Sequence, residues 1–153
     1  MAIDNKQIAR RLIEEVWSKG RIDLIDELVD PKFESKDPLI GTLNRDGLRE
    51  AVRTYRSAFP DLKFEVVSIL AEGNYVSVRW IARGTNLGPF MGMNSTGRAA
   101  TVTGLTLTEV RNGKVISDTF EMDSLGLMRQ LGLEPVGTHI PARQQPVETS
   151  KRT

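Results

Sequence analysis

Two aspartates near the end of a strand-like segment are the side chains best suited to proton transfer. Residues 115–122 have strand character, with Asp118 inside the segment and Asp123 directly after it. A carboxyl group that faces a pocket can move a proton from an activated methylene to a developing alkoxide. It does so near neutral pH when burial raises its pKa toward 7. The two acids therefore indicate acid–base chemistry, although each has a second interpretation.

Asp123 stands where a helix is expected to begin. The apolar residues of that helix are Leu125, Leu127, Met128 and Leu131. Aspartate is a preferred N-cap because its side-chain oxygen accepts backbone N–H groups of the first turn. Such hydrogen bonds stabilise the carboxylate and depress its pKa. Asp123 is therefore either a proton-transfer group or a helix cap.

The role of Asp118 depends on which face of its strand lines a pocket. Side chains alternate between two faces, which groups Asp118 with Ile116, Phe120 and Met122, against Ser117, Thr119, Glu121 and Asp123. If the apolar face lines the pocket, Asp118 is an acid among hydrophobic side chains; if the polar face does, Glu121 joins Asp123. A β-bulge would break this alternation, so both arrangements stay open, as does a surface position for Asp118.

Composition narrows the classes of function. The 153 residues suit one domain over residues 1–134, followed by an irregular or flexible tail over 135–153. A net charge of +1 argues against nucleic acid or an anionic membrane as a partner, and no apolar stretch approaches the length of a membrane span. The absence of cysteine excludes disulfides and thiolate chemistry and fits a cytoplasmic location. The single histidine, His139, falls in the tail, so neither a metal site nor a cofactor is expected.

The elements that must position these acids follow from periodicity. Helices are expected up to Gly20, over 23–29, and from Asn44 or Asp46 to Pro60. Strands are expected at 62–66, 75–83, 101–110 and 115–122, with a short extended piece at 33–37, a loop over 84–97 and a hairpin turn at Asn112-Gly113. Three helices, four antiparallel strands and a short helix make an α+β fold. A strongly bent sheet with helices over its concave side would form a cone with an internal pocket.

Several segments along the chain carry a resemblance to a known family. They are Val16-Trp17-Ser18-Lys19-Gly20, Asp37-Pro38, Phe59-Pro60-Asp61-Leu62, Val78-Arg79-Trp80, Gly84-Thr85, Gly88-Pro89-Phe90, Thr96-Gly97-Arg98, Gly113-Lys114-Val115 and the run from Asp123 to Gly132. In this order and spacing the chain resembles the SnoaL-like polyketide cyclases, also called ester cyclases, of the NTF2-like superfamily. The likeness spans residues 5–132.

The resemblance implies a fold, a class of chemistry and a partner. The fold is an NTF2-like cone-shaped barrel, in which N-terminal helices cover the concave face of a curved, mostly antiparallel sheet and enclose a pocket. Characterised members perform cofactor-free acid–base reactions such as aldol cyclisation of aromatic polyketides, while others isomerise, dehydrate or open epoxides, so the fold alone does not fix the reaction. The resemblance also implies a homodimer, and it matches Asp123 to the acid that serves as general acid and base in the cyclases.

The chain departs from the family at three positions where histidine is frequent. Lys36, Asn86 and Asp118 occupy these positions, and Thr119 stands where tryptophan often follows the last of them. Imidazole chemistry at these points is therefore absent. Either a carboxylate carries the proton or the reaction differs from the usual one.

The remaining candidates are binding residues, each with an ordinary alternative. Lys36 is either the electrostatic partner of a pocket acid or a solvated lysine, and Arg79 either binds an anionic oxygen or forms a cross-strand or dimer-interface ion pair. Asn86 is a candidate for polarising a substrate oxygen. The aromatic side chains are expected in the core or the pocket wall; they are Trp17, Tyr55, Trp80 and Phe90.

The sequence thus predicts a cofactor-independent enzyme that acts on a small, largely apolar carbonyl or hydroxyl compound. The reaction would be an aldol-type cyclisation or isomerisation, with Asp123 or Asp118 transferring the proton. A non-catalytic small-molecule-binding or assembly module is the alternative, and the missing histidines favour it. A third possibility is an epoxide-opening hydrolase with an Asp–Arg–Asp relay through Arg79.

Overall fold

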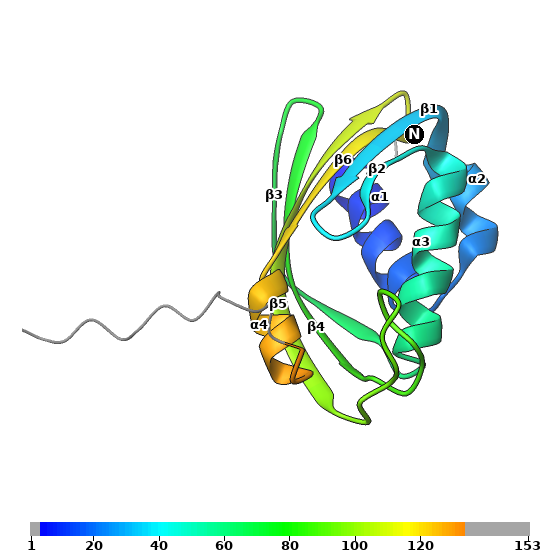
Figure 1. The fold of residues 1–153 in the computed structure, drawn as a ribbon. Helices are drawn as coiled ribbons and strands as arrows, with labels where there is room; N and C mark the ends of the chain where they lie inside the picture. The colour runs from blue at the N-terminus through cyan, green and yellow to red at the C-terminus, as the bar shows by residue number, and fades with distance from the viewer. Residues whose placement is uncertain (1–3, 134–153) are drawn as a thin grey trace, which may run out of the picture.

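The computed structural model describes residues 4–133 and has an α+β architecture, as predicted (Figure 1). Its helical segments are α1 (Asn5–Arg11), the π-helical η1 (Leu12–Trp17), the 3-10 turn η2 (Ile22–Leu24), α2 (Ile25–Leu28), α3 (Arg45–Ala58) and α4 (Ser124–Gln130). Its strands are β1 (Val29–Asp37), β2 (Gly41–Leu43), β3 (Lys63–Glu72), β4 (Tyr75–Thr85), β5 (Ala99–Arg111) and β6 (Lys114–Met122). The predicted tail and His139 lie outside the described residues.

The strands form one curved sheet in the order β2-β1-β6-β5-β4-β3. Every neighbouring pair is antiparallel except β1 and β6, which run parallel. The sheet bends but does not close, so it is an open, cone-like half-barrel (Figure 1). The prediction of four strands was too low, because the extended piece at 33–37 belongs to the longer strand β1 and β2 pairs with it.

Helices α1, α2 and α3 lie on the concave side of the sheet, where the core is, whereas α4 lies apart from them beside β5 (Figure 1). α1 and η1 bury Ile8, Leu12 and Val16 almost completely, and α3 buries Leu48 and Val52. Asn44 begins α3 by accepting the Gly47 N–H at 2.8 Å, as the N-cap preference predicts. Burial of these apolar stripes supplies the main driving force that holds helices and sheet together.

Two local irregularities decide which side chains reach the concave side. Asn112 and Gly113 both have positive φ, 51° and 77°, which confirms the predicted hairpin turn between β5 and β6. Just beyond it, the pairing of β5 with β6 shifts by one residue between Glu109 and Val110. Because this bulge interrupts the alternation, Val115 and Asp118 are both buried although they are an odd number of residues apart.

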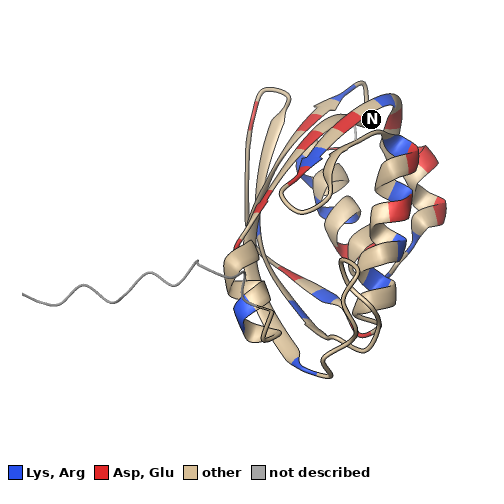
Figure 2. Cartoon of the chain, viewed as in Figure 1, with Lys and Arg blue, Asp and Glu red and all other residues tan. Residues whose placement is uncertain are grey.

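The exposed surface of the described residues carries mixed charge. Lys and Arg are interspersed with Asp and Glu along the helices and strands (Figure 2). Ion pairs such as Arg10–Glu14 and Arg49–Asp26 lie among them. No helix within residues 4–133 has the length and hydrophobicity to span a membrane.

Candidate ligand-binding pocket

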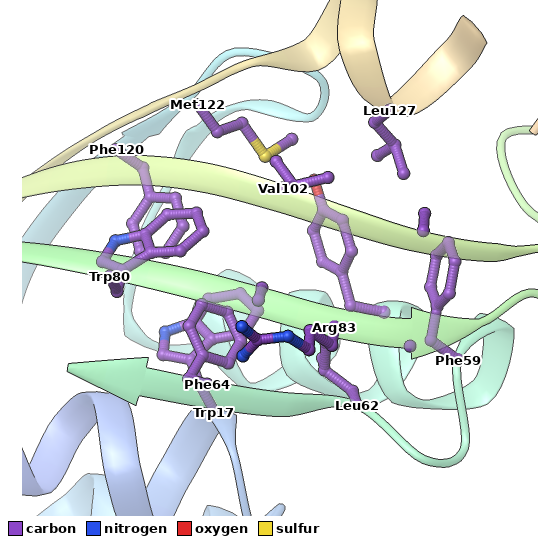
Figure 3. A pocket seen from close by; sticks show the side chains of 14 residues that line it. Trp17, Phe59, Leu62, Phe64, Trp80, Arg83, Val102, Phe120, Met122 and Leu127 are labelled. Atoms are coloured by element: carbon purple, nitrogen blue, oxygen red, sulfur yellow. The ribbon is translucent and has the colours of Figure 1, made fainter. Parts of the chain in front are cut away.

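An apolar pocket lies between the concave face of the sheet and the helices (Figure 3). Its volume is about 500 Å³, including the part that is open to solvent. The lining consists of Trp17, Tyr55, Phe59, Leu62, Phe64, Trp80, Ala82, Arg83, Gly84, Ala100, Val102, Phe120, Met122 and Leu127. Walls of this kind suit a small, largely apolar molecule.

Aromatic rings form the inner end of the pocket (Figure 3). The ring centroids of Trp80 and Phe64 are 4.9 Å apart, those of Trp80 and Phe120 5.1 Å, and those of Trp17 and Phe120 5.4 Å. Ring pairs at these distances contribute stabilising free energy in addition to that gained from burial of their apolar surface. The inner end is therefore a preformed aromatic cage.

The backbone of Trp17 is fixed by a cationic side chain from α3. The guanidinium of Arg56 donates to the carbonyl oxygens of Trp17, Ser18 and Leu62, at 3.3, 2.7 and 3.1 Å. Trp17 also ends the π-helical segment η1, in which the Ser18 N–H donates to the Ile13 carbonyl. Irregular segments of this kind are frequent at functional sites.

The two tryptophans of the cage differ in how their ring N–H groups are satisfied. Trp80 donates through Nε1 to the hydroxyl of Thr106 at 2.9 Å. The Nε1 of Trp17 is buried and has no hydrogen-bond partner among residues 4–133. A buried donor without an acceptor costs free energy, about 1–3 kcal/mol.

Asp118 lies behind the inner wall of the pocket. Only 3% of its surface is exposed, and its carboxyl accepts one hydrogen bond, from the Thr108 hydroxyl at 2.9 Å. Burial raises the pKa of Asp118 to about 7, and the Thr108 hydrogen bond offsets this only in part. Phe120, two residues along the same face of β6, lines the pocket, whereas Asp118 is not among the lining residues.

A second buried acid, Asp37, was not singled out from the sequence. It ends β1, is 7% exposed, and accepts the N–H groups of Leu39 and Ile40 at 2.7 and 2.9 Å. The hydroxyl of Tyr55, which lines the pocket, donates to its two carboxylate oxygens at 3.4 and 3.3 Å. Burial and the charge of Asp37 raise the pKa of Tyr55, so the hydroxyl stays protonated. An Asp-Pro pair at a strand end was the only signal in the sequence for this site.

Asp123 occupies the position of a helix cap. Its carboxylate accepts the Gly126 N–H at 2.8 Å at the start of α4. It borders a shallow hollow that it shares with Arg79 and Glu121, residues of the outer face of the sheet. Of its two sequence-based interpretations, the cap is confirmed, while the catalytic role stays a prediction.

Asn86 is fully buried and organises a loop. Its amide donates to the Gly88 carbonyl at 2.9 Å, and its Oδ1 accepts the backbone N–H and the hydroxyl of Thr96 at 2.8 and 3.1 Å. The donor nitrogen and the acceptor oxygen of the Asn86 side chain therefore both have hydrogen-bond partners within the loop. Phe90, in the same loop, packs its ring on Tyr55 and Phe59 at 5.5 and 5.4 Å.

The structure brings together only part of the predicted site. Trp17, Tyr55 and Trp80 line the pocket. Lys36 and Arg79 are exposed on the other face of the sheet, because their chain neighbours on β1 and β4 point inward. Within residues 4–133, no group of three or more acidic or histidine side chains is arranged to hold a metal ion.

The bent open sheet, the helices on its concave side and the apolar pocket define an NTF2-like fold. The chain belongs to the SnoaL-like polyketide cyclase family, whose family model matches residues 7–131. No curated protein matches it.

Solved structures with the same fold include a proposed SnoaL-like polyketide cyclase from Jannaschia sp. CCS1. It is 26% identical, with a TM-score of 0.78 over 86% of this chain and 93% of that one. A proposed polyketide cyclase from Acidithiobacillus ferrooxidans is 29% identical, with a TM-score of 0.72 over 88% and 100% of the two chains. AclR from Streptomyces galilaeus, a proposed hydroxylase, shares the fold at 24% identity, with a TM-score of 0.75 over 86% and 97%. Relatives assigned to different reactions thus share this architecture.

Proposed function

We propose that this protein binds a small, largely apolar carbonyl or hydroxyl compound in the aromatic pocket and catalyses a cofactor-independent acid–base step on it. The observation that carries the proposal is a carboxyl group, Asp118, that is buried two residues from the pocket-lining Phe120 with only the Thr108 hydroxyl as a side-chain partner; this burial raises its pKa to about 7. A group with this pKa exchanges a proton readily in both directions near neutral pH. Family membership favours an aldol-type cyclisation or an isomerisation.

In the proposed reaction, Asp118 takes one proton from the substrate and later returns it. The carboxylate of Asp118 removes a proton from the carbon beside a carbonyl, and the electrons of the C–H bond pass into an enolate. In a cyclisation the enolate carbon bonds to a second carbonyl carbon, whose oxygen becomes an alkoxide. Asp118 then returns its proton to that alkoxide, so no oxidant or reductant is needed. Because Asp118 is not among the residues that line the pocket, a ligand reaches this acid only if side chains of the inner wall move.

The groups that would polarise the oxygen differ from those expected from the sequence. Lys36 and Arg79 face outward, and Asn86 is committed to its loop. The hydroxyl of Tyr55 belongs to the pocket wall and is held by Asp37. Tyr55 is therefore the oxygen-binding group that this proposal favours. The outward position of Arg79 removes support for an epoxide-opening relay through that arginine.

A binding module without chemistry is the second candidate. The observation that favours it is the lining itself, in which no acid contacts the pocket space directly. The three positions without the frequent histidines favour it too. This candidate predicts ligand binding with no turnover.

A ligand screen followed by turnover assays separates the two candidates. The wild type and Asp118→Asn would be screened by thermal shift against aromatic polyketides, steroids, terpenoid epoxides and lactones. A ligand at about 100 times its dissociation constant stabilises a fold by about 2.7 kcal/mol, a shift of several degrees. Turnover of a bound compound by the wild type and not by Asp118→Asn supports the enzyme. Binding without turnover in either protein supports the module, and turnover that survives in Asp118→Asn contradicts the role of this acid.

Family resemblance also leads us to propose that the chain forms a homodimer. A dimer has twice the chain mass of 17.1 kDa, which light scattering at micromolar concentration resolves directly. A mass of one chain would contradict this proposal without bearing on the pocket.

A further inference from the structure

We infer that the indole N–H of Trp17 donates a hydrogen bond to a carbonyl oxygen of the bound compound, at the inner end of the pocket. The inference rests on the proposed function and deepens it, because it names the oxygen that the pocket recognises and the group that recognises it. Trp17 lines the pocket and is only 3% exposed. Its Nε1 is buried and has no hydrogen-bond partner among residues 4–133.

The other donors of the pocket wall are already engaged. The lining side chains that can donate a hydrogen bond are Trp17, Tyr55, Trp80 and Arg83. Three of them have an acceptor in the protein, which is Asp37 for Tyr55, Thr106 for Trp80 and Glu65 for Arg83. The Arg83 side chain is also half-exposed, so water satisfies its remaining N–H groups. Among the described lining residues, the donor that a ligand finds free is therefore that of Trp17.

The free donor favours ligands that carry an acceptor. In the empty protein the unpaired N–H of Trp17 costs folding free energy. A ligand oxygen at this position removes that cost on binding, whereas a hydrocarbon of the same shape leaves the donor unpaired. Trp80 has no such effect, because its N–H is bonded to Thr106 in the empty protein. The two tryptophans of one pocket thus have different roles.

The position of the Trp17 donor is fixed before a ligand arrives. The ring of Tyr55 meets the indole edge-on at 5.7 Å, and the rings of Phe64 and Phe120 pack on it at 6.1 and 5.4 Å (Figure 3). Arg56 holds the backbone carbonyl of Trp17 at 3.3 Å. A donor that is held in place loses little entropy when it binds. Burial also keeps bulk water from competing for it.

The chemistry of the indole selects the kind of oxygen. An indole N–H donates and does not accept, so it recognises an acceptor such as a carbonyl oxygen. Trp17 is then a second oxygen-binding group beside Tyr55, whose proton is already directed at Asp37. In the proposed enolisation negative charge develops on a carbonyl oxygen, and a hydrogen bond to that oxygen strengthens as it does so. The preferred compound is therefore an apolar ketone rather than a hydrocarbon.

Matched pairs of probes test this preference by binding alone. Indanone with indane, tetralone with tetralin and fluorenone with fluorene each exchange a carbonyl for a methylene on one skeleton. We would measure their dissociation constants for the wild type, Trp17→Phe and Trp80→Phe by NMR titration. The ratio of hydrocarbon to ketone constants should fall about tenfold in Trp17→Phe, because the donor is gone. Trp80→Phe is the matched control and should keep the wild-type ratio to within about threefold, whatever its effect on the two affinities.

The indole signals of the wild type give a direct readout. The chain has two tryptophans, so a nitrogen–proton correlation spectrum contains two indole signals. Each is assigned from its ring contacts in the wild type, so this readout does not depend on the folding of a variant. Every ketone that binds should move the Trp17 signal downfield, and its hydrocarbon partner should not. The Trp80 signal should respond equally to both members of a pair.

Each failure has a separate meaning. An unchanged ratio in Trp17→Phe, or a Trp17 signal that responds equally to ketone and hydrocarbon, overturns the inference and leaves the pocket and the proposed function standing. Equal losses of the ratio in Trp17→Phe and Trp80→Phe overturn it as well, because the preference would then come from the shape of the cage. If none of the six compounds binds the wild type, the inference and the proposed function fail together. Turnover that survives in Asp118→Asn contradicts the catalytic proposal alone.

Discussion

At the scale of single residues, the chemistry of Asp118 comes from its surroundings. The bulge in β6 turns it inward, and burial with one hydroxyl partner raises its pKa to about 7. An ionised carboxylate is costly in such a place, so the same burial that prepares the acid for proton transfer also destabilises the fold at high pH.

Replacement of Asp118 by asparagine should remove a pH dependence of stability. Folding raises the pKa of this group from 3.8 to about 7. At a pH between these two values, the folded state therefore keeps a proton that the unfolded state has lost. Wild-type stability should therefore fall as pH rises from about 4 to about 7, by at most about 4 kcal/mol. Asp118→Asn should lack this fall and exceed the wild type in stability at pH 8. Urea unfolding at pH 4.5 and 8 measures both.

A control variant on the surface makes that comparison specific. Glu72→Gln, at the exposed end of β3, removes one acid without touching the interior. It should keep the pH profile of the wild type. Equal pH profiles for the wild type and Asp118→Asn would contradict the raised pKa.

The sequence could name candidate acids but could not show which of them point inward or what contacts them. The acid–base role was assigned to Asp123 or Asp118 because one lies directly after the last strand and the other lies within it, and strand parity left the choice open. The bulge at Glu109 and Val110 shifts the register there and turns Asp118 inward. Asp37 was missed because the hydroxyl that contacts it comes from Tyr55, on a different element.

At the scale of elements, the carboxylate of Asp123 belongs to α4. A Cβ on Gly126 would lie 2.1 Å from the Oδ2 of Asp123, so the glycine is what lets the carboxylate sit over the first turn. Leu127 of the same helix lines the pocket, so the cap positions one of its walls.

Loss of this cap should cost stability in a graded way. Asp123→Ala removes the acceptor for the Gly126 N–H and should destabilise the protein by about 1 kcal/mol. Asp123→Asn retains a capping oxygen and should stay close to the wild type. Urea titration of the three proteins measures the difference. Turnover that disappears in Asp123→Asn with stability intact would instead support a catalytic role for Asp123.

Removal of the Asn86 side chain should loosen the loop between β4 and β5. Asn86→Ala breaks the hydrogen bonds to Gly88 and Thr96 and leaves buried polar groups without partners, a cost of about 1–3 kcal/mol. Amide hydrogen exchange over residues 86–98 should speed up, while exchange in β5 and β6 keeps its rate. Thr96→Val removes the hydroxyl that donates to Asn86 and accepts the Arg98 N–H but keeps the backbone hydrogen bond to Asn86, so it should have a smaller effect. Equal rates in all three proteins would contradict this role.

Elements with local signals were predicted well and those with distant partners were not. Periodicity and capping predicted α3 and the hairpin at Asn112-Gly113 because their contacts lie within a few residues. β1 was predicted only as a short piece, because Pro31 and its charged neighbours obscure the alternation and its parallel partner β6 is far along the chain. The glycine at Gly20 ends the first helix as expected, with a positive φ of 73°.

At the scale of the whole molecule, one missing side chain sets the depth of the pocket. Gly104 of β5 pairs with Trp80 of β4, and a Cβ at Gly104 would lie 2.1 Å from the indole ring. The ring therefore lies across the glycine and forms the inner wall with Phe120.

An alanine at position 104 should displace that wall. Gly104→Ala forces the Trp80 ring out of its place and should destabilise the fold by about 1–3 kcal/mol. It should also weaken the binding of any ligand that fills the pocket. The double variant with Trp80→Phe, which has a smaller ring, should recover part of both losses. Additive effects in this double-mutant cycle would contradict the contact.

The parallel pairing of β1 with β6 also bears on the order in which the molecule forms. Hairpins β3–β4, β4–β5 and β5–β6 join neighbours in the chain, whereas Ser35 meets Asp118 only after most of the described chain has been brought together. Contacts between residues far apart in the chain form late, because closing the long loop between them loses chain entropy before any contact compensates for it. We expect pulse-labelled amides of β4 and β5 to gain protection before those of β1. Asp118 would then begin folding as an ordinary carboxylate and take up its proton in the final step, so refolding between about pH 5 and 6.5 should end with measurable proton uptake, which fades above pH 7.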